Sequence, residues 1–340
     1  VQRALEASRL ERENAELRAR VSEEGEPSLI GISSSMKNVR SAIERIAPTA
    51  SRVLISGPNG SGKELSARSI HHQSDRGDAR FIVANCARLG TERADVELFG
   101  SENLSTSRRI VGLFEQAHKG TLYFDEICDL PMETQGKIVR AVTEQRFRRI
   151  GGNKEVSVDV RVISASSRDL AEEIRAGRLR EDLYYRLGVV PLTMPPLADR
   201  RDDIPHLARH FVDMVARRTG LSRVKLGDEV LAAMQGYHWP GNVRQMLNTI
   251  ENMVIMAPPD RSQPLGLDLL PAEIQNISPV SGNSDIDALL ALPLREAREA
   301  FETSYMAAQL QRFDGNVSQM AGFVGMERSA LHRKLRSLRV

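Results

Sequence analysis

The stretch that decides the fold is VLISGPNGSGKE, residues Val53–Glu64. Its start, Val53–Ile55, is a short apolar run typical of a buried strand, and ELSARSIHH after the loop is predicted to be a helix. Between them lies a G-x-x-x-x-G-K pattern, in which backbone N–H groups and a lysine hold the phosphates of a nucleotide such as ATP or GTP. The alternative, a Gly/Ser surface loop with a chance lysine, is disfavoured by the flanking strand and helix. The predicted nucleotide-binding residues of this loop are Gly57, Pro58, Asn59, Gly60, Ser61, Gly62, Lys63 and Glu64.

Two carboxylates, Asp125 and Glu126, are predicted to complete the same site. Glu64 stands where the loop pattern usually has a Ser or Thr hydroxyl for Mg²⁺, so another residue must hold the metal. The segment TLYFDE, residues 121–126, reads as a strand that delivers both acids to the carboxyl edge of a parallel sheet, where ligands bind in open α/β folds. We expect Asp125 to hold Mg²⁺ and Glu126 to polarise an attacking water molecule.

The composition excludes fibrous and disordered classes, because the 340 residues are 41% hydrophobic and 27% charged. The net charge of +2 indicates no partner by itself. Two cysteines, Cys86 and Cys128, cannot build a disulfide framework and no zinc spacing is present, which favours a reducing, cytoplasmic setting. No apolar run approaches the roughly 20 residues of a membrane helix, and no signal peptide is visible, so we expect no membrane partner. The histidines that we expect to be solvated or capping, without a metal, are His71, His72, His206 and His210.

Strands that alternate with helical segments predict an α/β fold with a parallel sheet. Residues 1–24 carry an a/d stripe with Asn14 at an a position, which favours a two-stranded coiled coil and hence a dimer. The alternative for that segment is a linker helix packed on the next domain. The expected organisation is a helical linker at 1–27, a nucleotide-binding α/β subdomain at 28–194, a helical lid subdomain at 195–258, a second linker at 259–292 and a helical DNA-binding domain at 293–340.

The last 47 residues are predicted to form a helix-turn-helix. Leu294–Arg312 is one amphipathic helix, Asn316 caps a short second helix, Gly325 makes the turn, and Glu327–Leu338 is the final helix. The final helix is basic and contains no acidic residue after its first position, which suits contact with DNA phosphates, although a solvated basic face would look the same. The candidate DNA contacts are Arg328, Ser329, His332, Arg333, Lys334 and Arg336.

At this level of detail the chain resembles a known family. The blocks GPNGSGKE, FIVANCARL, ELFG, GTLYFDEI, RLREDLYYRL, PPLADRRDDIPHLA and HWPGNVRQ are similar, in the same order, to the AAA+ domain of NtrC-family bacterial enhancer-binding proteins, which work with sigma-54 RNA polymerase. The C-terminal segment GNVSQMAGFVGMERSALHRKLRSL resembles a Fis-type helix-turn-helix. The resemblance covers nearly the whole chain from Leu29, and a glutamate after the loop lysine is usual in that family.

The resemblance implies roles for individual residues. Asn85 matches the switch asparagine that restrains the catalytic glutamate until activation. Arg180 and Arg186 match arginines that reach the nucleotide of a neighbouring subunit, which implies a ring oligomer, and Arg244 matches the sensor arginine of the lid. Lys63, Asp125 and Glu126 keep the roles given to them above.

Two departures from the family narrow the match. The family carries a GAFTGA loop that contacts sigma-54, but here SENLSTSRRIV fills the interval between Gly100 and Gly112. Ser166 and Ser167 stand where the family usually has Thr-Asn as a γ-phosphate sensor, so hydrolysis is expected to be weakened or differently coupled. With the ASSRDL strand end and the ERSALHRKLRSL terminus, these features resemble NtrX-type response regulators, whose receiver domain is phosphorylated by a histidine kinase; no receiver domain is present in this sequence.

The expected function is therefore an ATP-binding, sequence-specific DNA-binding transcription regulator of a two-component system. The altered loop disfavours contact with sigma-54 polymerase. The alternative is a sigma-54-dependent activator ATPase that remodels RNA polymerase with a divergent loop. A third hypothesis is a core that binds nucleotide without useful turnover.

Overall fold

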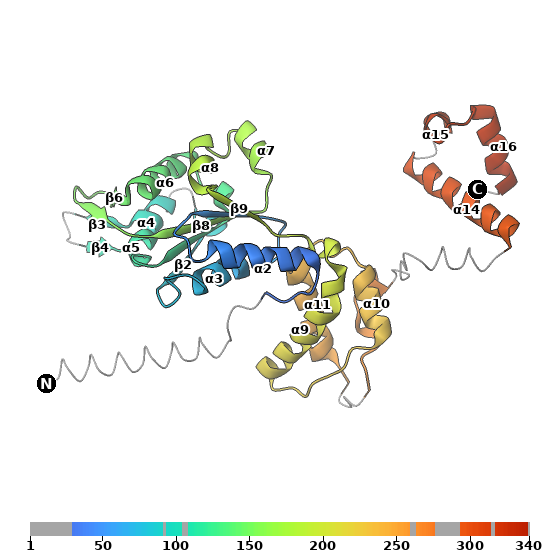
Figure 1. Ribbon diagram of the computed structural model, residues 1–340, viewed down its shortest axis with the longest axis horizontal. Coiled ribbons are helices and arrows are strands. Elements are labelled where there is room, and N and C mark those ends of the chain that lie inside the picture. Colours follow the sequence, from blue (N-terminus) through green and yellow to red (C-terminus); the bar gives the residue numbers. More distant parts are fainter. Residues whose placement is uncertain are drawn as a thin grey trace. The chain divides into compact units, whose positions relative to one another are not determined.

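The computed structural model describes residues 29–90, 93–103, 108–258, 263–275, 293–313 and 317–338. The chain divides into two compact units, Val1–Gln275 and Asn276–Val340. The first contains an α/β subdomain and a helical lid, and the second contains three described helices (Figure 1). The predicted coiled coil and the predicted cap at Asn316 lie outside the described residues. Among the described helices, none combines the length and hydropathy of a membrane span.

A five-stranded parallel sheet forms the centre of the α/β subdomain, which confirms the predicted fold class. The strand order is β2-β5-β8-β1-β9, so β8 separates the strand before the phosphate loop from the strand that ends in the two acids. The register pairs Ser56 with Ser166 and Asn85 with Asp125, so the carboxyl ends of four strands meet at one edge. The strands are β1 (Val53–Ser56), β2 (Phe81–Asn85), β5 (Thr121–Asp125), β8 (Arg161–Ser166) and β9 (Val190–Thr193).

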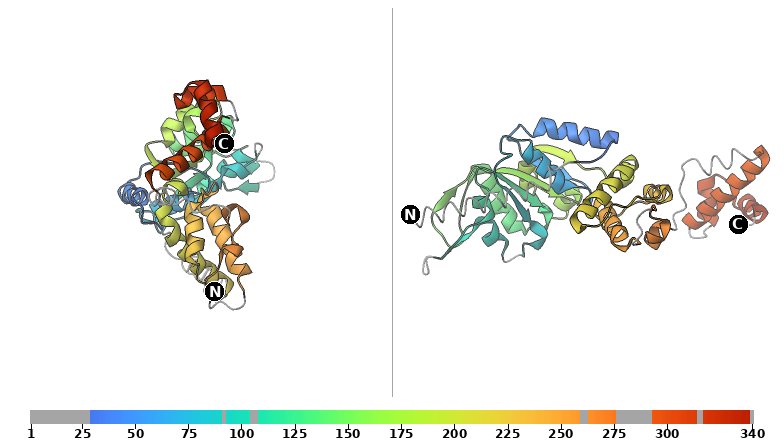
Figure 2. Two further views of the ribbon diagram at one scale, coloured as in Figure 1. Left: turned by 90° about the vertical axis from the view of Figure 1, so that its right-hand side faces the viewer. Right: turned by 90° about the horizontal axis from the view of Figure 1, so that it is seen from below.

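Helices cover both faces of this sheet. On one face lie α2 (Ser34–Ile46) and α3 (Lys63–His72), and Figure 2 shows α2 along the outside of the subdomain. The apolar stripe of α2 consists of Met36, Val39, Ile43 and Ile46, and all four are buried. The opposite face packs against α4 (Ala94–Phe99), α5 (Leu113–Gln116), α6 (Met132–Glu144) and α8 (Glu181–Leu187). Side chains alternate along β5: Tyr123 packs in the core beneath α2 and α3, and Phe124 packs in the core on the opposite face of the sheet.

Two short hairpins extend the α/β subdomain. The interval between Gly100 and Gly112 forms the antiparallel pair β3 (Ser101–Asn103) and β4 (Arg108–Ile110), and a second pair consists of β6 (Arg146–Arg148) and β7 (Glu155–Ser157). A bridge joins the two hairpins, between Ser101 at the start of β3 and Ile150 in the segment that connects β6 to β7.

The lid consists of α9 (Ile204–Thr219), α10 (Asp228–Gly236), α11 (Asn242–Met256) and α12 (Ala272–Gln275) around a core of its own. Trp239 is 1% exposed in that core, and its indole N–H donates to the carbonyl of Met234 at 2.7 Å. The lid also contacts the phosphate loop, because the Asn242 amide donates to the Asn59 carbonyl at 2.9 Å. The backbone N–H of Val243 donates to the Gly60 carbonyl at 3.0 Å. The start of α11 is therefore fixed against the loop.

We predict that Gly60→Ala destabilises the first unit by about 1–2 kcal/mol more than the control Gly177→Ala. Both glycines have a left-handed φ, 75° and 70°, so both substitutions cost about 1 kcal/mol through the backbone alone. A Cβ on Gly60 would in addition lie 2.3 Å from the Gly241 carbonyl oxygen, whereas nothing lies within 4 Å of a Cβ on Gly177. Urea unfolding followed by Trp239 fluorescence measures the difference, and equal midpoints would contradict a close lid–loop contact.

Candidate functional site

The phosphate loop connects β1 to α3 at the carboxyl edge of the sheet. Three of its glycines have positive φ angles, 147° at Gly57, 75° at Gly60 and 106° at Gly62. Because α3 begins at Lys63, the unpaired N–H groups of its first turn and the positive end of its dipole lie at the loop. This is the geometry of an anion site at a helix N-terminus.

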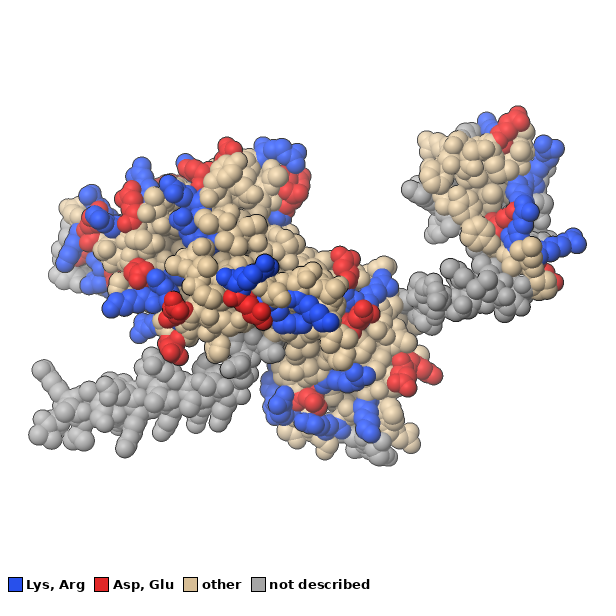
Figure 3. All heavy atoms as spheres, in the orientation of Figure 1, with Lys and Arg blue, Asp and Glu red and all other residues tan. Residues whose placement is uncertain are grey.

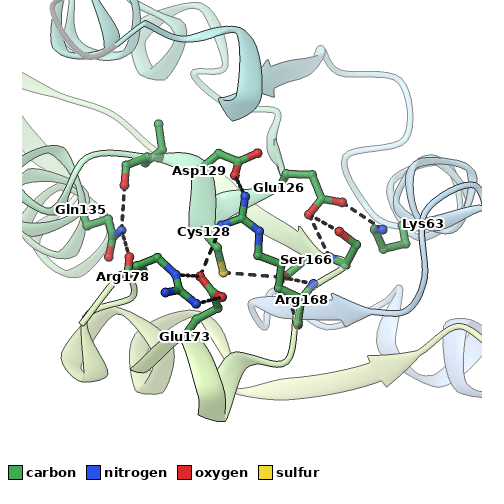
Figure 4. A network of polar contacts seen from close by, with 11 residues as sticks. Lys63, Glu126, Cys128, Asp129, Gln135, Ser166, Arg168, Glu173 and Arg178 are labelled. Carbon is green, nitrogen blue, oxygen red and sulfur yellow. Dashed lines mark hydrogen bonds and ion pairs between the residues drawn. The ribbon is translucent and has the colours of Figure 1, made fainter. Parts of the chain in front are cut away.

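Lys63 and Glu126 form an ion pair at the centre of the site (Figure 4). The Lys63 Nζ atom lies 3.0 Å from Oε1 of Glu126, and it also donates to the carbonyl of Gly57 at 3.0 Å. The side chains are 6% and 17% exposed, so water screens the pair less than it would at the surface. A phosphate held in the loop would compete with Glu126 for the same ammonium group.

The Glu126 carboxylate is held from its other side by Ser167. Its Oε2 atom accepts the Ser167 N–H at 2.8 Å and the Ser167 hydroxyl at 2.9 Å. Burial alone would raise the pKa of Glu126, but the hydrogen bonds from Ser167 and Lys63 outweigh it and the net pKa shift is downward. The carboxylate is therefore ionised at neutral pH, which is the form that can orient and polarise a water molecule.

Asp125 ends β5 and is partly exposed beside Glu126. Burial raises the pKa of Asp125, a hydrogen bond from the Tyr123 hydroxyl at 3.0 Å opposes that shift, and the nearby charge of Glu126 raises it further. Glu64 pairs instead with Arg68 at 2.7 Å, which leaves Asp125 as the better candidate metal ligand. The described residues contain no group of three metal-binding side chains, so Mg²⁺ would need phosphate oxygens and water as further ligands.

Asn85 ends β2 beside Asp125, and its side chain is exposed. Among the described contacts, none joins Asn85 to Glu126, whose carboxylate is held by Ser167 and Lys63. The restraint of Glu126 by Asn85 therefore stays a prediction. Ser167 is the partner that the sequence reasoning missed. The signal in the sequence is the position of Ser167: it directly follows β8, the strand next to β5, and so lies at the ligand-binding edge close to Glu126.

The three candidate arginines lie on two different elements. Arg244 is exposed in the first turn of α11, where its Cβ would be 3.1 Å from a Cβ on Gly60, so it lies beside the phosphate loop. Arg180 immediately precedes α8 and pairs with Asp182 through two contacts of 3.0 and 2.9 Å. Arg186 is exposed in the last turn of α8. In the described structure neither α8 arginine contacts Lys63, Asp125 or Glu126, so their action on another subunit stays a prediction.

The second unit contains α14 (Leu294–Arg312), α15 (Val317–Val324) and α16 (Arg328–Leu338). Gly325, with φ of 71°, makes the turn between the last two helices. These helices enclose a small core of Met306, Met320, Ala321, Leu331 and Leu335. This arrangement agrees with the predicted helix-turn-helix.

The basic residues of α16 are not equivalent. Figure 3 shows Lys and Arg side chains along the edge of the second unit that α16 forms. Arg328, Ser329 and Arg333 are exposed. Lys334 forms an ion pair with Glu302 of α14, which also pairs with Arg298 at 3.1 Å. Lys334 is thus engaged within the unit, and the predicted contacts at His332 and Arg336 stay predictions.

The domain order agrees with three known protein families. Residues 29–193 match the sigma-54 interaction domain, residues 198–287 match the AAA+ ATPase lid domain, and residues 297–338 match the Fis family of bacterial regulatory proteins.

Individual relatives are similar over the whole length of the chain. The nitrogen assimilation regulatory protein NtrX of Azorhizobium caulinodans is 49% identical over 341 residues, which cover 100% of this chain and 74% of that protein. Crystal structures of NtrX from Brucella abortus in complex with ADP and with ATP are 46% identical, with TM-scores of 0.72 and 0.71. They cover 100% and 96% of this chain, and 74% and 73% of those chains. This chain therefore belongs to the NtrX-type response regulators, with a sigma-54 interaction domain, an AAA+ lid and a Fis-type helix-turn-helix.

Proposed function

We propose that this chain is a DNA-binding transcription regulator whose AAA+ core binds and hydrolyses ATP with Mg²⁺. The observation that carries the proposal is the meeting of Lys63, Asp125 and Glu126 at one edge of the sheet. Arg244 of the lid lies beside the same loop. The related NtrX of Brucella abortus has been crystallised with ADP and with ATP, which supports the choice of nucleotide.

Each residue then has one task in hydrolysis. The N–H groups of the loop and the Lys63 ammonium hold the β- and γ-phosphates. Asp125 would hold Mg²⁺, which would neutralise charge on those phosphates. Glu126 orients a water molecule whose oxygen forms a bond to the γ-phosphorus while the bond to the β–γ bridging oxygen breaks, giving ADP and phosphate. The hydrogen bonds from Ser167 hold the Glu126 carboxylate in a fixed orientation, which suits the orienting of a water molecule.

We predict that Lys63→Ala abolishes ATP binding, whereas Glu126→Gln keeps binding and slows turnover by about 100-fold or more. Lys63 supplies the only buried ammonium among the described residues of the loop and its neighbours, and Glu126 acts on the water. Titration with a fluorescent ATP analogue and phosphate release measure the two effects. Lys37→Ala on α2, where the lysine is exposed, is the matched control. Equal turnover by wild type and Glu126→Gln would mean that the core binds ATP without hydrolysing it.

Arg186 is exposed on α8, which is a different element from the phosphate loop and from the lid. This position supports a role for Arg186 at the nucleotide of a neighbouring subunit. A guanidinium that reaches the γ-phosphate of the next subunit would stabilise the charge that develops in the transition state. Arg180 and Arg186 would then make ATP hydrolysis depend on self-association. The Arg180–Asp182 pair would have to open, and as an exposed pair it contributes little to stability.

Mixing two inactive variants tests this arrangement. We predict that Arg186→Ala and Lys63→Ala are each slow alone and that their mixture recovers part of the wild-type turnover. In the mixture, a Lys63→Ala subunit supplies Arg186 to the intact phosphate loop of an Arg186→Ala neighbour. Phosphate release over a series of mixing ratios measures the recovery. If no ratio exceeds the sum of the two separate rates, the arginine acts within its own subunit.

The second unit supports sequence-specific binding to double-stranded DNA. A basic helix that follows a glycine turn is the element that a helix-turn-helix places in the major groove. Two copies on a dimer would read a two-fold site. Arg328 and Arg333 are exposed on α16 and are free to contact bases or phosphates, whereas Lys334 is held by Glu302.

We predict that Arg333→Ala weakens binding to a specific DNA site by about 1–3 kcal/mol, and that Lys334→Ala has a clearly smaller effect. The two residues are neighbours and lose the same charge, but Lys334 already pairs with Glu302. Fluorescence anisotropy with a labelled operator at fixed salt concentration measures both. A chain that ends at Gln275 should bind no operator specifically, and specific binding by that chain would refute the assignment.

A sigma-54-dependent activator is the second candidate function. The match of residues 29–193 to the sigma-54 interaction domain favours it. The sequence SENLSTSRRIV between Gly100 and Gly112, which differs from the GAFTGA sequence, argues against it. This candidate requires capture of sigma-54 in the presence of a transition-state analogue of ATP, which the first candidate does not require.

A further inference from the structure

The residue after Ser167 begins a second set of charged contacts, seen in Figure 4. Ser167 holds Glu126, and Arg168 follows it directly. The Arg168 guanidinium pairs with Asp129 on one side and with Glu173 on the other, the latter at 3.3 Å. A shift of Ser167 would therefore move a guanidinium that is fixed to two carboxylates.

Glu173 joins Arg168 to a second arginine. It lies on α7 (Leu170–Arg175), and its side chain is only 6% exposed. Arg178 donates to both of its carboxylate oxygens, at 2.9 Å from Nε and 2.6 Å from the terminal nitrogen. The hydrogen bonds from Arg178 are the main reason why the pKa of Glu173 is lowered to about 2. A forked pair of this kind fixes orientation as well as distance.

The contacts continue from Arg178 to the start of α8. The carbonyl of Arg178 accepts a hydrogen bond from the amide of Gln135, a fully buried residue of α6, at 2.8 Å. The same Gln135 side chain accepts the backbone N–H of Arg180 at 2.9 Å. Arg180 is the residue before α8, which carries Arg186. Polar contacts, joined by the backbone at Ser167–Arg168 and at Arg178, thus link Glu126 to the start of the helix that carries Arg186.

We propose that Glu173 is a positioning residue that couples phosphate binding at a subunit's own site to the placement of α8 and its arginines. The proposal rests on the proposed ATP site. The switching element is the Glu126 carboxylate, which Lys63 holds on one side and Ser167 on the other. A phosphate that binds Lys63 would remove one of these two partners and so change the contact of Glu126 with Ser167. Arg168, Glu173 and Arg178 then carry the change to residues 178–180. A purely structural brace between α7 and α8 would leave α8 insensitive to nucleotide.

Hydrogen–deuterium exchange of the α8 region tests the coupling without any need for hydrolysis. The probe is ATPγS, and its binding to each protein is verified first by displacement of a fluorescent ATP analogue. In the wild type, we expect ATPγS to slow amide exchange in residues 178–187 about fivefold. Glu173→Gln should bind ATPγS as tightly as the wild type but lose that response. Glu172→Gln is the matched control, because it removes the same charge from an exposed neighbour on the same helix and should keep the response.

The outcomes separate this inference from the proposed function. If ATPγS binds the wild type but leaves exchange in residues 178–187 unchanged, or if Glu173→Gln keeps the full response, the coupling is overturned. If ATPγS does not bind the wild type, the proposed ATP site itself is wrong, and the coupling falls with it. Should Glu173→Gln fail to fold by circular dichroism, Arg168→Gln replaces it, because that variant leaves the Glu173–Arg178 pair intact and should also lose the response.

Discussion

The ion pair between Lys63 and Glu126 is the interaction on which the rest of the site depends, because its two residues follow strands that are not neighbours. β8 lies between β1 and β5, and adjacent strands are about 4.8 Å apart, so the side chains must reach across the end of β8. The residues at that end, Ser166 and Ser167, are small. They leave room for the pair, and Ser167 adds two hydrogen bonds to it.

This pair also explains two unfavourable features of the site. A lysine that is 6% exposed loses most of its hydration, and Glu126 has a left-handed backbone with φ of 56°, which is uncommon for a residue with a side chain. Both costs are offset at the same place, because the ammonium contacts the Glu126 carboxylate and the Gly57 carbonyl, while the carboxylate accepts three donors. Such strain persists only where the surrounding contacts determine the conformation, and that is typical of functional sites.

The sequence allowed the local parts of this protein to be predicted and left the long-range contacts open. The apolar stripe of α2 at Met36 and Ile43, and the strand that ends at Asp125, follow from periodicity and composition within a few residues. The Asn242 amide meets the phosphate loop 183 residues away, and no local pattern encodes that contact. The sequence places Ser167 directly after a strand, but its contact with Glu126 depends on how the carboxyl ends of β5 and β8 align. Likewise, Lys334 belongs to a basic run, and only the packing of α14 against α16 places Glu302 beside it.

The lid is joined to the phosphate loop by more than α11. Arg200, which is 3% exposed, donates to the Ser61 carbonyl at 2.8 Å. Three residues later Asp203, fully buried, accepts the N–H and the hydroxyl of Ser33 at 2.7 Å each. One turn of the lid therefore holds both the loop and the residue that caps α2, and each buried group left without its partner would cost about 1–3 kcal/mol. Because separating the lid from the loop would break several such bonds together, a movement of the lid must be transmitted to the loop and to the segment before α2.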